Sequence, residues 1–215
     1  MACACDKSER AQDFVDPVPV IDSIPDVNDS VHNPVDTVID VNDTIPQTAY
    51  VTYFTKAGDH YSDREAIDLL SKDSILIKAV FDSSAVYETV QPSNQKDWNK
   101  LIGFSDCGTH HHTNSMRTVW RYDKNKGIEI GAYWYKSGKR HWKNLKTIQP
   151  FDTVEVAVVA RASKYIVRVD EITFEEPRAC NSSVFRYWLF PYFGGDETAP
   201  HDITIQVQHV FPIKE

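Results

Sequence analysis

From residue 48 to the C-terminus, apolar and polar residues alternate with a period of two, and the apolar positions are rich in β-branched and aromatic side chains. This pattern is typical of strands that bury one face. It predicts strands at 49–55, 74–82, 116–122, 128–136, 153–160, 165–170, 184–193 and 202–210. Turn-forming residues separate several of them, at 123–127, 136–139 and 161–164. So many short strands predict an all-β domain at 48–215, folded as a two-sheet antiparallel jelly-roll sandwich.

One short helix is expected within this domain. Ser62-Asp63-Arg64-Glu65 matches a capping box, in which serine and glutamate side chains satisfy backbone amides at a helix N-terminus. The helix would then run through Ala66 to Ser71.

Residues 13–47 have a different composition, in which Pro, Asp and Val recur and glycine is absent. The prolines prevent a regular helix, the aspartates repel one another and the scattered valines cannot form a core. We expect a disordered stalk, extended by up to about 100 Å if it is polyproline-like. The aspartates of this stalk account for most of the net charge of −8, so the remaining domain is nearly neutral.

The first residues, 1–12, place small residues before cysteine and polar residues after it. They resemble the end of a bacterial lipoprotein signal, with Cys3 or Cys5 as the lipidated residue. No apolar run is long enough to cross a bilayer, so we expect membrane attachment through a lipid anchor only. The expected location is extracytoplasmic, at the outer membrane or cell surface. Such a location permits a disulfide between Cys107 and Cys180, although two free thiols are an equal alternative.

The segment 103–115 is the first candidate site, because polar groups are dense in it. Its candidate ligand contacts are Asp106, His110, His112 and Asn114. Histidines can bind Zn²⁺, and Asp106 could orient one of them. In an extended chain adjacent residues point alternately, so His110 and His112 alone would share a face, and two ligands do not make a metal site.

The segment 192–202 is a candidate calcium site. Carboxylates on a glycine-containing turn, beside free carbonyls, suit the oxygen ligands of Ca²⁺, and they are supplied by Asp196, Glu197 and Asp202. A tight turn, in which these carboxylates accept local amide hydrogen bonds, is the alternative.

The third candidate is the stretch 117–146, where aromatic and basic residues interleave. Flat aromatic faces can stack on sugar rings while Arg and Lys attract acidic groups. The candidate contacts are Arg117, Trp120, Tyr133, Trp134, Tyr135 and Trp142. Only half of these can face outward on a strand: either Tyr133 and Tyr135 are exposed and Trp134 is in the core, or the reverse. The mixture would also suit single-stranded nucleic acid, which the extracytoplasmic location disfavours.

With strands and motifs placed, the domain resembles the concanavalin A-like lectin and glucanase superfamily, whose jelly rolls bind or cleave glycans and often carry Ca²⁺ near the last strand. The segments 103–120 and 189–205 resemble uncharacterised secreted or lipoprotein-type proteins of Bacteroidota. The Glu-x-Asp-x-x-Glu strand of the glucanases is missing; residues 170–176 come nearest, with the wrong spacing. Lyase-like jelly rolls combine Arg, Gln, His and Tyr, which Arg117, His112 and Tyr133 would imitate in part.

The sequence therefore favours a non-catalytic, surface-displayed carbohydrate-binding or adhesion module that binds a glycan of acidic type, with Ca²⁺ ordering the terminal loop. The alternatives are a polysaccharide lyase or hydrolase using His112, Arg117 and Tyr133, and a protein-binding or structural envelope domain.

Overall fold

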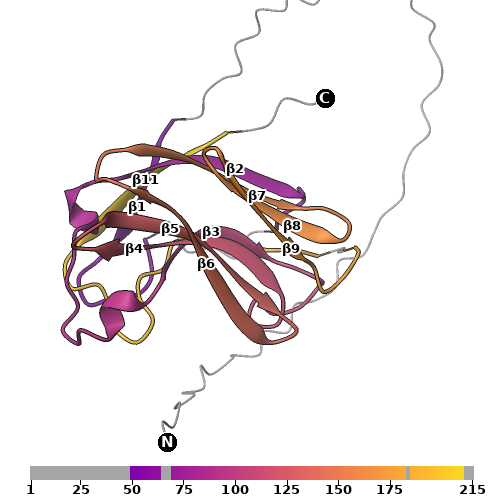
Figure 1. The fold of residues 1–215 in the computed structure, drawn as a ribbon, viewed down its shortest axis with the longest axis horizontal. Helices are drawn as coiled ribbons and strands as arrows, with labels where there is room; N and C mark the ends of the chain where they lie inside the picture. The colour runs from indigo at the N-terminus through magenta and orange to yellow at the C-terminus, as the bar shows by residue number, and fades with distance from the viewer. Residues whose placement is uncertain (1–48, 64–68, 183–184, 211–215) are drawn as a thin grey trace, which may run out of the picture. The chain divides into compact units, whose positions relative to one another are not determined.

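The computed structural model describes residues 49–63, 69–182 and 185–210, which form a sandwich of two antiparallel sheets (Figure 1). The all-β sandwich predicted from the sequence is therefore confirmed. The predicted stalk and N-terminal segment lie outside the described residues. So do residues 64–68, which include the start of the helix predicted at 66–71. The end of that prediction is wrong, because residues 69–71 are not helical and Leu69 forms a β-bridge with Tyr187. Among the described residues, no helix is long and apolar enough to cross a membrane.

One sheet, which we call sheet A, has the strand order β1-β11-β2-β7-β8-β9. Its strands are β1 (Val51–Thr55), β2 (Ser74–Phe81), β7 (Thr153–Ala160), β8 (Lys164–Val169), β9 (Ile172–Pro177) and β11 (Ile203–His209). β2 alternates half-buried and buried residues along its whole length, as the period-two pattern predicts.

The other sheet, sheet B, has the order β10-β3-β4-β5-β6. Its strands are β3 (Asn99–Ser105), β4 (Ser115–Asp123), β5 (Gly127–Lys136), β6 (Lys139–Ile148) and β10 (Trp188–Leu189). Two single-turn 3₁₀ helices, η1 (Ser83–Ala85) and η2 (Asn94–Lys96), lie in the connection between β2 and β3.

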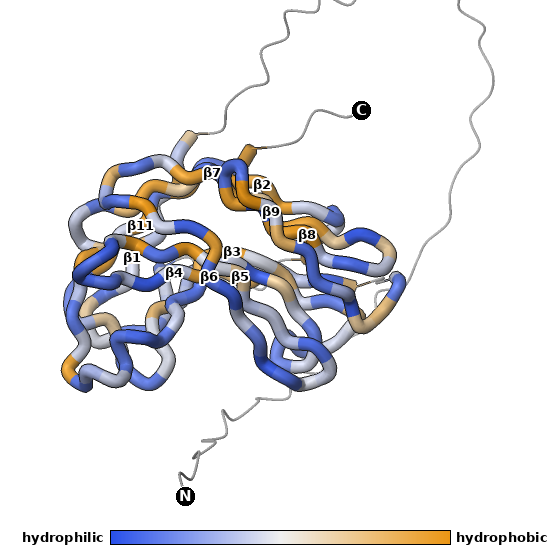
Figure 2. Tube along the Cα trace, viewed as in Figure 1, coloured by the Kyte–Doolittle hydropathy of each residue, from blue (hydrophilic) through white to orange (hydrophobic). Residues whose placement is uncertain are grey.

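The hydrophobic core fills the space between the sheets, and apolar positions of strands from both layers appear orange in Figure 2. Sheet A supplies residues such as Ile77, Phe81 and Val156, while sheet B supplies Trp120 and Ile130. Since Trp120 and Trp134 belong to this core, the odd-numbered residues of β4 and β5 face outward from sheet B.

Three strands were not predicted, and each has a physical reason. β3 contains Gly103 and a register shift between Lys100 and Gly103, which break the alternation. β6 is the edge of sheet B and is exposed at most positions, so it has no apolar side to detect. β9 is the edge of sheet A and is rich in charge. The strand predicted at 184–193 is wrong over most of its length, because of the described residues 185–193 only Trp188–Leu189 form a strand.

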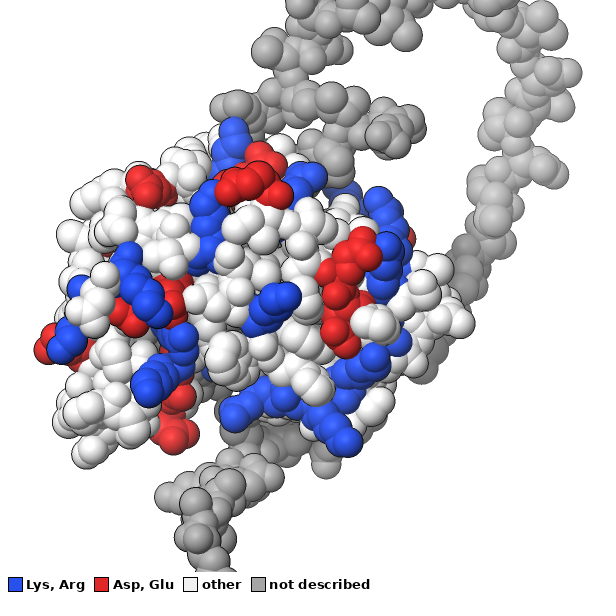
Figure 3. Space-filling view, in the orientation of Figure 1, with Lys and Arg blue, Asp and Glu red and all other residues white. Residues whose placement is uncertain are grey.

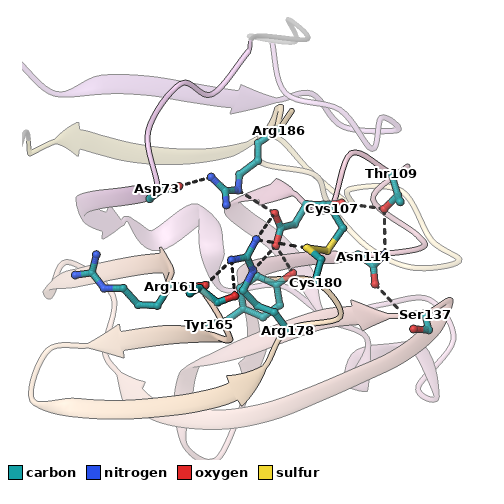
Figure 4. Close-up of polar contacts among 12 residues, drawn as sticks. Asp73, Cys107, Thr109, Asn114, Ser137, Arg161, Tyr165, Arg178, Cys180 and Arg186 are labelled. Atoms are coloured by element: carbon teal, nitrogen blue, oxygen red, sulfur yellow. Dashed lines mark hydrogen bonds and ion pairs between the residues drawn. A yellow bond between two sulfur atoms is a disulfide. The ribbon is translucent and has the colours of Figure 1, made fainter. Parts of the chain in front are cut away.

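A buried ion cluster ties the two layers together at the end of β3. Asp106 is fully buried and accepts hydrogen bonds from Arg178 (2.8 and 3.0 Å), Arg186 (2.9 Å) and the Tyr165 hydroxyl (2.8 Å). Next to it, Cys107 forms a disulfide with Cys180, so the paired alternative holds and the free-thiol alternative is wrong (Figure 4). The cluster and the disulfide fix the start of the 107–114 turn to the body of the fold.

Candidate functional site

The outward face of sheet B brings the aromatic and basic residues together in one row. The pairing registers place Gly103 beside Arg117, Arg117 beside Tyr133, and Tyr133 beside Trp142. These residues come from β3, β4, β5 and β6, so the row runs across the strands. At about 4.8 Å between neighbouring strands, it is roughly 15 Å long, enough for several sugar rings.

Aromatic rings form an apolar patch along this row, separate from the main core. Trp98, Val119 and Tyr133 are buried together with Tyr135 packed against them. Trp142 lies beside Trp98, with ring centroids 5.7 Å apart, and is 52% exposed. The patch therefore offers at least one broad ring face to solvent.

Arg117 is buried beneath this face, and in the part of the chain that the structure describes no carboxylate lies within ion-pairing distance of it. Its Nη2 donates to the Phe190 carbonyl at 2.7 Å, while its Nε is buried without a hydrogen-bond partner. Burial lowers the pKa of Arg117 to about 9, so the guanidinium is still charged at neutral pH. A buried cation with an unsatisfied donor is costly unless an anion approaches it.

Lys100 is a second cation on this face, one strand away, and it is half-buried. Its Nζ donates to the Gly194 carbonyl at 2.7 Å and lies 5.7 Å from the centre of the Tyr133 ring and 5.4 Å from that of Tyr192. Burial first, and the charge of Arg117 second, lower the pKa of Lys100 to about 7. An amine that titrates near neutrality can exchange protons with a substrate.

The hydroxyl of Tyr133 lies in the same environment. Burial, and next the neighbouring Tyr135, raise the pKa of Tyr133 well above its ordinary value, so the phenol is neutral and can donate a proton. The rings of Tyr133 and Tyr135 are 5.9 Å apart, and Tyr135 in turn lies 5.1 Å from His112.

A groove of about 710 Å³ adjoins the row on the side of β10. Its lining includes Tyr61, His110, His111, Arg117, Tyr187 and Tyr192. Tyr61 is 46% exposed, and its ring meets that of Tyr192 edge-on at 5.0 Å. Arg117 thus belongs to both the row and the groove, which makes it the centre of the candidate site.

Both acidic and basic side chains surround this site, so the surface around it is not uniformly positive. In Figure 3, basic side chains gather over the hairpin of β5 and β6, with acidic side chains beside them. At the far end of the outer face, Arg121 pairs with the buried Glu129 at 2.7 Å and stacks on Trp98. The cations at that end are therefore neutralised, in contrast to Lys100 and Arg117.

Several predicted contacts have structural roles instead. Asp106 is buried in the ion cluster and cannot orient a histidine or touch a ligand. Asn114, predicted as a contact, is buried and holds the turn: its Oδ1 accepts from the Ser137 amide at 2.9 Å and its Nδ2 donates to Thr109 at 3.2 Å (Figure 4). Trp120 and Trp134 face the core, so their predicted ligand contacts are wrong.

The predicted calcium ligands do not converge. Glu197 accepts hydrogen bonds from the amides of Val90 and Gln91, and Asp202 accepts one from Ala57 at 2.8 Å. In the described part of the chain, the groups of three His, Cys, Asp or Glu residues whose ligand atoms approach within 4.8 Å do not include Asp196, Glu197 and Asp202 together. A three-carboxylate site is therefore wrong, and Ca²⁺ bound by one of them with carbonyl groups stays a prediction.

Lys100, Tyr192, Arg140 and His111 were missed by sequence reasoning. Lys100 lies on the unpredicted strand β3, and its burial depends on residues nearly a hundred positions away, such as Gly194. Tyr192 was within a segment considered only for metal binding. Arg140 is the second residue of the unpredicted strand β6 and is paired with Tyr135.

No protein-family model matches the sequence, and no curated protein does. Solved structures do share the fold. Alginate lyase AlyC3 aligns with a TM-score of 0.53 at 11% identity, covering 74% of this chain and 72% of that one. Alginate lyase Aly36B aligns with a TM-score of 0.52 at 11% identity, covering 74% and 78%. A variant of Aly36B with a lysine and a tyrosine replaced by alanine, in complex with an alginate tetrasaccharide, aligns at 0.51 and 12%, covering 74% and 78%.

Proposed function

We propose that this protein binds an acidic polysaccharide across the outward face of sheet B. The observation that carries the proposal is a pair of cations, the buried Arg117 and the half-buried Lys100, which have carbonyl partners but, among the described residues, no carboxylate within ion-pairing distance. A uronate carboxylate placed between them would satisfy the free Nε of Arg117. Trp142 and the rings of the groove would stack on the sugars to either side.

The structural neighbours favour a uronic acid polymer over other anionic glycans. The three reported above are alginate lyase structures, and one was determined with an alginate tetrasaccharide. Alginate is therefore the first ligand to test, with a neutral glucan oligosaccharide of equal length as comparator.

The test is calorimetric titration of the full chain with an alginate tetrasaccharide. Arg117→Gln is expected to weaken binding by about thirtyfold, corresponding to about 2 kcal/mol for a lost buried charge contact. Arg168→Gln on β8 of the opposite sheet carries the same charge change and is expected to bind normally. Because Arg117 is buried, its replacement can destabilise the fold, so the melting temperature of the Arg117→Gln variant is measured as well. If that variant is unstable, Arg117→Lys replaces it. Equal binding of the neutral glucan would refute the proposal.

A second candidate function is elimination at the same site, and the proximity of Lys100 to Tyr133 favours it. Unprotonated Lys100 would take the proton from the carbon beside the carboxylate that Arg117 neutralises. The electrons left behind would form a carbon–carbon double bond as the glycosidic carbon–oxygen bond breaks, and the Tyr133 phenol would protonate the leaving oxygen. His112, which the sequence also suggests for a lyase, is exposed and lies against Tyr135.

Elimination yields an unsaturated sugar that absorbs ultraviolet light, so lyase activity can be followed directly. Incubation with alginate and polyglucuronate should raise the absorbance, and Lys100→Met should abolish the increase while tetrasaccharide binding is measured separately. A flat signal after prolonged incubation, with binding intact, would leave the non-catalytic module as the function.

We also propose an extracytoplasmic location with a lipid anchor at Cys3 or Cys5. The Cys107–Cys180 disulfide supports it, because disulfides persist in oxidising compartments. Mass spectrometry of the N-terminal peptide from the native host would reveal the lipid, and an unmodified peptide would refute the anchor.

A further inference from the structure

Three consecutive histidines in the turn between β3 and β4 come together in space. The ligand nitrogens of His110, His111 and His112 all lie within 4.8 Å of one another. Their ring centroids are 4.2 Å apart for His110 and His111, 4.4 Å for His111 and His112, and 5.1 Å for His110 and His112. We propose that these three imidazoles bind one borderline transition-metal ion, such as Zn²⁺.

The local backbone explains why three adjacent residues can share one ligand. In an extended chain His111 would point away from its neighbours, which is why the sequence predicts at most two on one face. Instead the chain curls, and the amides of Thr113 and Asn114 both donate to the His110 carbonyl, at 2.8 and 3.2 Å. In a curled segment successive side chains are rotated by much less than half a turn, so all three can converge.

The turn is anchored on every side, so the three donors are held before a metal arrives. Cys107 is fixed by the disulfide at its start, and Asn114 links Thr109 to Ser137 at its end (Figure 4). The amide of Gly138 also donates to the Thr113 carbonyl at 3.0 Å, which joins the turn to the hairpin of β5 and β6. Such anchoring lowers the ordering cost of metal binding.

His111 has the outer partner that metal-bound histidines usually have. Its Nδ1 lies 2.9 Å from the Tyr187 hydroxyl, which also accepts the His111 amide at 3.0 Å. With its Nδ1 proton donated to that oxygen, the Nε2 lone pair of His111 is free for the metal. The Nδ1 of His110 accepts only a long hydrogen bond, at 3.3 Å from the His112 amide, which coordination would replace.

The donor set selects the class of ion. Neutral imidazoles suit Zn²⁺, Cu²⁺ and Ni²⁺, whereas Ca²⁺ and Mg²⁺ require oxygen ligands. Three ligands leave a fourth position for water or for a sugar oxygen. Since His110 and His111 line the same groove as Arg117, the ion would lie at one end of the candidate binding surface. The metal site does not depend on the proposed function, because its ligands and its anchoring are separate from the row of sugar contacts.

The experiment is calorimetric titration of the full, tag-free chain with ZnCl₂, in a background of Cys3→Ser and Cys5→Ser that removes competing thiolates. One ion per chain is expected, and His112→Ala and His110→Ala should each weaken binding by at least about tenfold. His141→Ala, an exposed histidine on β6 outside the cluster, is the matched control and should bind normally.

Two further measurements distinguish a built site from a histidine-rich surface. Tyr187→Phe keeps the ring and removes the hydroxyl partner of His111, and is expected to weaken Zn²⁺ binding by about tenfold. X-ray absorption of the Zn²⁺-loaded chain should show three imidazole ligands. Unchanged affinity in His112→Ala, or one or two imidazoles in the absorption spectrum, would overturn the proposal.

Discussion

At the scale of single residues, the unusual feature is the half-buried amine of Lys100, which no carboxylate of the described residues approaches within ion-pairing distance. The groups that face Lys100 come from several elements, namely Asp97, Arg117, Tyr133, Arg140, Tyr192 and Asp196. The cations among them add to the effect of burial, and the two carboxylates oppose it only in part, because the pKa of Lys100 remains at about 7. The sequence shows that a lysine is present, but burial depends on packing between distant segments.

This low pKa predicts a specific dependence of stability on pH. The folded pKa of about 7 lies below the ordinary lysine value, so the unfolded chain holds one more proton between about pH 7 and 10. The free energy of unfolding should therefore rise with pH above 7, by up to about 1.4 kcal/mol per unit. In Lys100→Met this contribution should vanish. Urea denaturation of both proteins from pH 6 to 9 measures the difference, and parallel curves would contradict the assignment.

A second residue-scale prediction concerns the exposed ring of Trp142. Trp142→Ala should weaken tetrasaccharide binding by about fivefold, equivalent to about 1 kcal/mol of stacking, with little change in stability because the ring is half exposed. Phe151→Ala removes another exposed aromatic ring, on the connection between β6 and β7, and should leave binding unchanged. Equal losses in both variants would point to a general effect of surface aromatics.

At the scale of elements, the predictability of each strand follows from its exposure. β2 and β7 are central and alternate regularly, and the predicted bounds at Thr153–Ala160 agree with the structure. β6 and β9 are edges with polar sequences, so no hydrophobic pattern distinguishes them from loops. Because β6 carries Arg140 and Trp142, missing this strand also hid how those residues join the site. The sequence alone could not decide whether Tyr133 or Trp134 faces outward, because that depends on which face of sheet B packs against sheet A.

The bulged strand β3 depends on a glycine. A Cβ at Gly103 would lie 2.2 Å from the Arg117 Cβ and 2.3 Å from the Met116 carbonyl oxygen, so β3 or β4 would have to move. Gly103→Ala is expected to cost about 1–3 kcal/mol in stability and to weaken alginate binding by displacing Arg117. Thermal melting and calorimetry measure the two effects.

Gly58→Ala is the control for Gly103→Ala, because it introduces backbone strain without a steric clash. Gly58 has a φ of 86° but no atom within 4 Å of an added Cβ, so it should lose stability without losing ligand affinity. Lost affinity in this variant too would mean that the effect on binding is not specific to the bulge.

At the scale of the whole molecule, the disulfide joins segments that are 73 residues apart and closes a loop that contains most of sheet B. In Cys107→Ser with Cys180→Ser, unfolding should become easier by about 2–4 kcal/mol, because the unfolded chain regains the freedom of that loop. Guanidinium denaturation measures this. A reduced wild-type chain should match the double variant, and an unchanged midpoint in both would show that Asp106 with its two arginines suffices to fix the turn.

The row of outward residues crosses the strands of sheet B, and this direction affects how its ligand specificity can change by mutation. Each position along the row is contributed by a different strand, and the side chains there project from a framework whose inner face is occupied by the core. If the proposed binding mode holds, a change at one outward position alters the recognition of one sugar while leaving the neighbouring contacts in place. Such an arrangement lets specificity evolve one monosaccharide at a time, and a library randomised at one residue per strand would explore it in the same modular way.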